Sequence, residues 1–157
     1  MVKKKKSFLF ISTSRADYSH QRFLIKESLK SKKLNIKLLV SGSHFSKNFG
    51  NTFREIQKDQ INIDYKVKIK EKMIRDNNFT FLIRYLFEKT NGILKKNNFD
   101  AIIIFGDRFE MLAIAYLAII LRIPIIHIYG GEITQGSTDD LIRHSITKLS
   151  NYHLVKN

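Results

Sequence analysis

Short apolar runs alternate with amphipathic segments along most of the chain. The apolar runs lie at residues 8–12, 36–40, 63–67, 101–105, 123–128 and 152–155, and their shortness is typical of buried strands. Helices are expected at about residues 17–30, 53–58, 79–96, 109–121 and 138–150, the third of them with apolar residues close to i, i+3, i+4 spacing. Residues 68–78 are charged and lack such a period, which predicts a mobile loop. The order of segments is therefore a β–α alternation.

The stretch 101–132 carries the strongest structural signal. Its two strand segments are apolar on both faces, which is the mark of a parallel sheet covered by helices. We therefore predict an α/β fold, a Rossmann-like doubly wound parallel sheet with right-handed crossovers. Polar clusters at 12–18, 41–44, 106–110 and 127–132 each follow a predicted strand, so they should meet at one edge of the sheet. Neither a G-x-G-x-x-G after the first strand nor a P-loop is present in the sequence.

Composition narrows the class of protein. The 157 residues fit one domain, and the 43% hydrophobic content argues against disorder. The sequence has no long apolar run, no convincing signal peptide and no cysteine, so we expect a cytoplasmic protein that does not bind membranes. The net charge of +14 is spread over several short Lys-rich runs without aromatic interleaving. It indicates solvated faces rather than a nucleic-acid site, although a basic nucleic-acid-binding module is the competing hypothesis from a different class.

Four polar motifs lie at the predicted edge in this order along the chain: Arg15-Ala-Asp17-Tyr18; Gly42-Ser43-His44 with Phe49-Gly50-Asn51-Thr52; Gly106-Asp107-Arg108-Phe109-Glu110; and His127-Ile-Tyr129-Gly130-Gly131-Glu132. A fifth motif, Asp139-Asp140-Leu-Ile-Arg143-His144-Ser-Ile-Thr147-Lys148, opens the last predicted helix. With these motifs the sequence resembles the hydrolysing UDP-N-acetylglucosamine 2-epimerases of the sialic- and legionaminic-acid pathways. The resemblance implies the N-terminal half of a GT-B fold, spanning residues 1–157. It also implies that the C-terminal nucleotide-binding domain is absent and would act in cis or in trans, and that the full-length protein is a homo-oligomer.

The family reaction removes UDP from C1 and a proton from C2 of the sugar, and water then adds to the glycal-like intermediate. Such chemistry needs a positioned base and cationic help for the leaving diphosphate, but no cofactor. The resemblance assigns catalytic roles to Asp107, His127, Glu132 and Asp139. Substrate-binding roles fall to Arg15, Asp17, His44, Arg108, Arg143 and His144. Tyr129 stands where several family members have a glutamate, and no residue cluster has the spacing of a metal site.

Each of these residues also has a structural interpretation. Asp107 fits an N-cap with Glu110 as its capping-box partner, and Asp17 fits an N-cap of its own helix. Asp139 lies four residues before Arg143, which favours an ion pair on the helix surface. The structural alternative for His127 is a buried ring held by hydrogen bonds, and the alternative for His44 is a residue of a turn. At Gly130 and Gly131 we expect the backbone to approach a ligand closely. A non-catalytic remnant and a non-hydrolysing 2-epimerase are the alternatives for the whole chain.

Overall fold

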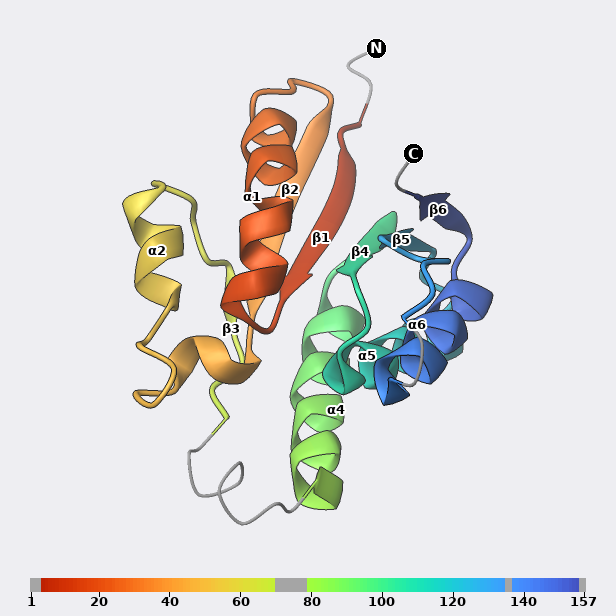
Figure 1. Cartoon of the computed structure of the whole chain (residues 1–157). Coiled ribbons are helices and arrows are strands. Elements are labelled where there is room, and N and C mark those ends of the chain that lie inside the picture. Colours follow the sequence, from red (N-terminus) through yellow and green to blue (C-terminus); the bar gives the residue numbers. More distant parts are fainter. Residues whose placement is uncertain (1–3, 70–78, 135–136, 156–157) are drawn as a thin grey trace.

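The computed structural model describes residues 4–69, 79–134 and 137–155 and contains a parallel sheet with helices on both faces (Figure 1). The strands are β1 (Lys6–Ser12), β2 (Leu34–Val40), β3 (Tyr65–Lys66), β4 (Ala101–Phe105), β5 (Ile125–Ile128) and β6 (Tyr152–Leu154). Their spatial order is β3-β2-β1-β4-β5-β6, and all neighbouring pairs are parallel. The strand order reverses between β1 and β4, which makes this pair the topological switch point.

The helices are α1 (Arg15–Leu29), α2 (Phe53–Lys58), α4 (Phe79–Lys96), α5 (Phe109–Ile120) and α6 (Thr138–Leu149), with a 3-10 turn η1 (Gly42–Phe45). The alternating side chains of the strands form two apolar clusters, one on each face of the sheet. Leu9 and Ile102 pack with residues of α4, α5 and α6. Phe10 and Ile103 pack with residues of α1 and α2 on the other face. The predicted doubly wound arrangement follows from these two clusters.

Most predicted elements lie where the sequence placed them, and the differences have local causes. Strand β5 begins at Ile125 rather than at residue 123, because Pro124 has no N–H to donate to a ladder. Helix α1 begins at Arg15, since Ser14 rather than Asp17 is its N-cap. The predicted mobile loop at 68–78 lies outside the described residues except for its first two positions. Among the residues that are described, no helix has both the length and the apolarity needed to cross a bilayer.

Candidate functional site at the carboxyl edge of the sheet

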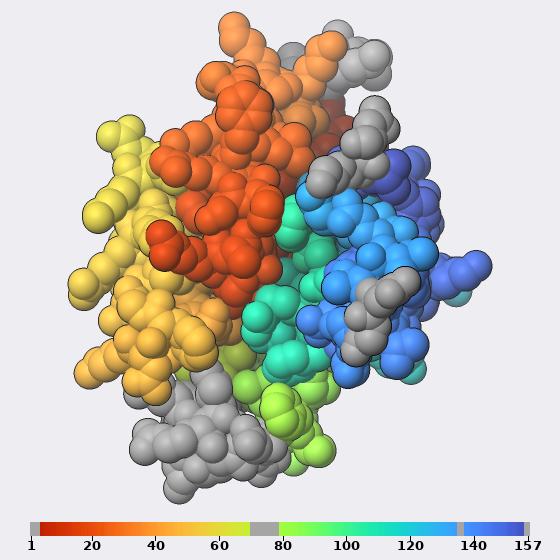
Figure 2. Space-filling model, in the orientation of Figure 1, coloured from red at the N-terminus to blue at the C-terminus, as the bar shows by residue number. Residues whose placement is uncertain are grey.

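The loops that carry the predicted site residues all follow the carboxyl ends of strands. Arg15 lies just after β1, His44 after β2, Asp107 after β4 and Glu132 after β5. Because these strands are parallel, the four positions share one edge of the sheet. In Figure 2 the red start of α1, the teal start of α5 and the blue segment after β5 lie around a depression on one face of the molecule. The predicted convergence of the motifs is thus present in the fold.

Asp17 closes the loop after β1. One carboxylate oxygen, Oδ2, accepts hydrogen bonds from Thr13 N at 3.0 Å, Thr13 Oγ1 at 2.8 Å and Ser14 N at 3.0 Å. Ser14 Oγ in turn accepts the Asp17 N–H, which completes a capping box with Asp17 at N3. The prediction that Asp17 is the N-cap is therefore wrong by three residues. The carboxylate, only 4% exposed, fixes the loop that presents Arg15.

His44, a residue of η1, is fully buried against this loop. Its Nε2 lies 2.9 Å from Ser12 Oγ and its Nδ1 lies 2.8 Å from Thr52 Oγ1. Burial lowers the pKa of His44 to about 4, so the imidazole is neutral at pH 7. Gly42, at the start of η1, has φ +60° and approaches the loop so closely that a Cβ there would lie 2.2 Å from Thr13 O. The loops after β1 and β2 are therefore packed backbone to backbone.

A pocket of about 520 Å³ opens between the N-termini of α1 and α5. Its lining combines cationic, acidic and polar side chains with apolar ones. The lining residues are Ser14, Arg15, Ala16, Gly42, Ser43, Phe49, Thr52, Ile69, Phe79, Leu82, Arg108, Phe109 and Glu110. Two helix N-termini and two arginines beside one pocket are a combination suited to an anionic group such as a diphosphate.

The two arginines of the pocket are held differently. Arg15 is largely exposed and its Nε lies 3.1 Å from Glu55 Oε1. Arg108 is the N-cap residue of α5, and its Nη2 donates to Glu110 Oε1 at 2.9 Å. Burial by itself would lower the pKa of the Arg108 guanidinium, but the hydrogen bond and the charge of Glu110 outweigh it and raise that pKa. Both side chains are thus cationic at the mouth of the pocket.

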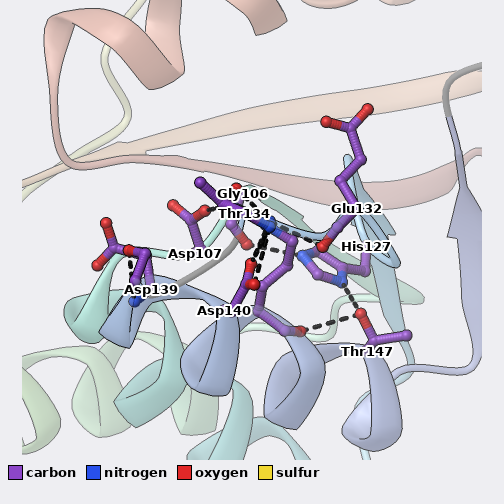
Figure 3. Close-up of polar contacts among 10 residues, drawn as sticks. Gly106, Asp107, His127, Glu132, Thr134, Asp139, Asp140 and Thr147 are labelled. Atoms are coloured by element: carbon purple, nitrogen blue, oxygen red, sulfur yellow. Dashed lines mark hydrogen bonds and ion pairs between the residues drawn. The ribbon is translucent and has the colours of Figure 1, made fainter.

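Asp107 lies beside the pocket in a buried ion-pair cluster. Arg143 Nη2 donates to Asp107 Oδ2, and Arg143 Nη1 donates to Asp140 Oδ1 at 2.8 Å. The guanidinium is only 9% exposed, against 26% for the Asp107 side chain and 16% for that of Asp140. Asp107 therefore is not the N-cap of α5, and Arg143 pairs with Asp140 and Asp107 rather than with Asp139. Figure 3 shows this cluster between β4, the loop after β5 and α6.

His127 lies under the same cluster and is fully buried. Its Nε2 is 2.7 Å from Gly106 O, which can only accept, so this nitrogen carries a proton. The other nitrogen, Nδ1, is 3.2 Å from Thr147 Oγ1 (Figure 3). Burial is the main reason that the pKa of His127 is lowered. A Cβ on Gly130 would lie 2.6 Å from His127 Nδ1, so the close approach expected at this glycine is to the imidazole.

The remaining predicted residues lie around this cluster. Glu132 is half-buried, its backbone carbonyl accepts from Arg143, and no described residue donates to its carboxylate. Asp139 is exposed in the first turn of α6, while His144 is exposed one turn further along. In the view of Figure 3 the Asp107 side chain lies between those of Asp139 and Glu132. Tyr129 packs against the rings of Phe105, at 5.3 Å between centroids, and His20.

A family model matches most of the chain. The model for UDP-N-acetylglucosamine 2-epimerases matches residues 26–157. The chain belongs to this family. It is 34% identical over 153 residues to the polysialic acid biosynthesis protein P7 of Escherichia coli. It is 33% identical over 155 residues to the GDP/UDP-N,N'-diacetylbacillosamine 2-epimerase (hydrolyzing) of Campylobacter jejuni. Both alignments cover 96% of this chain but only 38% and 39% of those proteins, so the chain spans about two fifths of their length.

Solved structures of 2-epimerases share the fold of this family member. The UDP-GlcNAc 2-epimerase of Neisseria meningitidis, solved with bound UDP-GlcNAc, matches with a TM-score of 0.82 at 18% identity, over 95% of this chain and 40% of that chain. The Rickettsia bellii enzyme matches with a TM-score of 0.78 at 21% identity, over 98% and 39%. The predicted fold class, a Rossmann-like sheet of the N-terminal half of a GT-B fold, is confirmed.

Three further side chains belong to the candidate site although the sequence assigned them no catalytic or binding role. Asp140 pairs with Arg143, and Thr147 lies beside His127 and donates to the Arg143 carbonyl. Both residues lie one helical turn from Arg143 along α6, and this spacing is the sequence signal that could have indicated their contacts with it. Glu110 is 3% exposed, and its Oε2, like Arg108 Nε, is buried without a hydrogen-bond partner. Nothing in the sequence distinguishes this buried carboxylate from a solvated residue in a first helical turn. No described group of three or more His, Asp or Glu residues is arranged to hold a metal ion.

Proposed function

We propose that this chain forms the N-terminal half of a hydrolysing nucleotide-sugar 2-epimerase that acts on UDP-N-acetylglucosamine or a diacetamido analogue. A base takes the proton from C2, UDP leaves C1 with the bonding electrons, and water adds across the resulting glycal to give the free C2-epimeric sugar. One observation carries the proposal: a carboxylate cluster and a pocket with two arginines and two helix N-termini adjoin at one edge of the sheet.

Carboxylates suit the proton-transfer steps, since an aspartate or glutamate is ionised at neutral pH and can act as a base. Asp107 is held by Arg143 and still 26% exposed, so one face of its carboxylate is open to a substrate. No described residue donates a hydrogen bond to the side-chain carboxylates of Glu132 and Asp139, which are drawn on either side of the Asp107 side chain in the view of Figure 3. We assign proton transfer to these three carboxylates. His127 contributes by holding Gly106, the residue before Asp107.

The leaving diphosphate requires positive charge that is already in place. Arg15 and Arg108 line the pocket, and each stands at the start of a helix whose free N–H groups favour anions. Asp17 and His44 contribute indirectly to diphosphate binding, because their hydrogen bonds fix the loop that carries Arg15. His144, on the exposed face of α6, is assigned a contact at the rim of the site.

Nucleotide binding needs a second protein surface opposite the pocket, which a C-terminal domain acting in cis or in trans would supply. The support for this partner is length, because the relatives are about two and a half times as long as the part matched by this chain. Their printed names also support the substrate class, since the Campylobacter jejuni relative and its Legionella pneumophila counterpart are diacetylbacillosamine 2-epimerases (hydrolyzing). A homo-oligomeric assembly remains a prediction.

The test is UDP release from UDP-GlcNAc and from UDP-diacetylbacillosamine. The protein is assayed alone and together with the C-terminal three fifths of the Campylobacter jejuni relative. We expect UDP and a free sugar inverted at C2, and a fall of at least about 100-fold in Asp107→Asn. Asp100→Asn is the matched control, because Asp100 lies at the opposite edge of the sheet, paired with Lys6. No UDP release in either preparation refutes the proposal, and UDP that stays on the epimerised sugar identifies a non-hydrolysing enzyme instead.

A further inference from the structure

Helix α6 fixes the two loops that carry the candidate catalytic carboxylates. Arg143 and Asp140, one turn apart on this helix, contact both the loop after β4 and the loop after β5. We propose that Arg143, with Asp140, is a positioning residue that sets the separation of the Asp107 and Glu132 carboxylates, and that it does not bind the substrate. The catalytic meaning of this inference rests on the function proposed above.

The hydrogen bonds of the Arg143 guanidinium are all directed at the protein. Nη1 donates to Glu132 O at 2.8 Å, to Thr134 Oγ1 at 3.2 Å and to Asp140 Oδ1 at 2.8 Å, while Nη2 donates to Asp107. The side chain is 9% exposed. A guanidinium engaged in this way has little surface left for a phosphate, whereas Arg15 and Arg108 face the pocket.

Asp140 completes the connection to the loop after β5. Each of its carboxylate oxygens accepts the backbone N–H of Thr134 at 2.8 Å, and Oδ1 also accepts from Arg143. The loop is therefore held at Glu132 by its carbonyl and at Thr134 by its amide. Both attachments originate on α6, so the position of Glu132 relative to Asp107 depends on one helix.

A second set of contacts links the same three segments on the side of His127. His127 Nε2–H donates to Gly106 O, and Thr147 Oγ1 lies 3.2 Å from His127 Nδ1 and donates to the carbonyl of Arg143 at 2.9 Å. The loop before Asp107 is thus linked to α6 on two sides. This closed arrangement predicts that loss of the Arg143 contacts displaces the loops locally while the buried histidine and the helix stay in place.

Arg143→Lys tests the inference, because lysine keeps the charge but cannot reach Asp107 and the Glu132 carbonyl at the same time. Two readouts are measured: steady-state kinetics in the preparation that releases UDP, and amide hydrogen exchange of the protein alone. We expect kcat to fall by about 10- to 100-fold with KM changed by less than about threefold. We expect exchange at the Thr134 amide to accelerate by about tenfold without a matching increase in the core strands. Asp140→Asn should produce the same local change in exchange.

Arg84→Lys is the matched control, since Arg84 is an exposed helical arginine on α4 and should change neither readout. A rise in KM with kcat unchanged would show that Arg143 binds substrate and would overturn the inference. Unchanged exchange at Thr134 in both variants would overturn it as well. If the unsubstituted protein releases no UDP, the proposed function fails, and the exchange measurement alone decides whether α6 holds the two loops.

Discussion

The buried ring of His44 should make the stability of this protein depend on pH in a defined window. In the folded protein burial lowers the pKa of His44 to about 4, from the ordinary value of 6.5 that applies once the chain unfolds. Below pH 6.5 His44 binds a proton in the unfolded chain but stays neutral in the folded protein until the pH approaches 4. Acidification therefore favours unfolding. The contribution of the neutral ring is complete above pH 6.5 and is lost as the pH falls toward 4.

The magnitude follows from the two pKa values. One pKa unit corresponds to about 1.4 kcal/mol, so the loss relative to pH 7 is about 2 kcal/mol at pH 5 and about 3 kcal/mol at pH 4. The ring is completely buried, so solvent screening does not reduce this figure. A typical domain has about 5–15 kcal/mol of stability, and the effect is therefore large enough to measure.

Urea unfolding followed by circular dichroism at pH 7, 6, 5 and 4 measures the effect. The comparison is with His44→Gln, whose amide can bond to Ser12 and Thr52 but does not titrate. The second buried histidine, His127, is present in both proteins, so its own titration cancels in the difference. We expect the unsubstituted protein to lose about 2 kcal/mol relative to the variant between pH 7 and pH 5. A difference that stays constant over this range would refute the assignment of His44 as a buried neutral base.

Four further substitutions test the loops of the site by urea unfolding. Gly42→Ala should cost about 3 kcal/mol or more, because its φ of +60° is unfavourable for alanine and the new Cβ would lie 2.2 Å from a backbone carbonyl oxygen. Gly131→Ala, with φ +78° but open space around its Cβ, should cost only about 1 kcal/mol. Asp17→Asn should cost about 1–3 kcal/mol, since an amide oxygen replaces the buried carboxylate oxygen that accepts three hydrogen bonds. Gly130→Ala should cost about 1–3 kcal/mol and shift the imidazole NMR signals of His127, whose Nδ1 would be 2.6 Å from the new methyl group; unshifted signals would contradict the close approach.

Particular residues show where sequence reasoning about the site ends. The helix start at residues 14–17 contains two good capping residues, Ser14 and Asp17. An N-cap residue has an extended backbone, and in the folded chain it is Ser14 that adopts this conformation. Asp107 and Glu110 have the spacing of a capping box, yet Arg143, 36 positions away in sequence from Asp107, takes the aspartate as its partner. The same fold brings Asp140 to Arg143, so Asp139 remains exposed. Each of these outcomes depends on a competition between partners.

The sequence by itself determined the order of strands and helices, the parallel sheet and the edge at which the polar loops meet. These features depend on the spacing of apolar residues and on strand direction, which are local properties of the chain. Only the tertiary structure decided which polar groups are buried, which remain open and which pair with one another. That distinction is physical, because the partner of a buried charge such as Arg143 is set by α6 packing beside the loops after β4 and β5, a long-range arrangement.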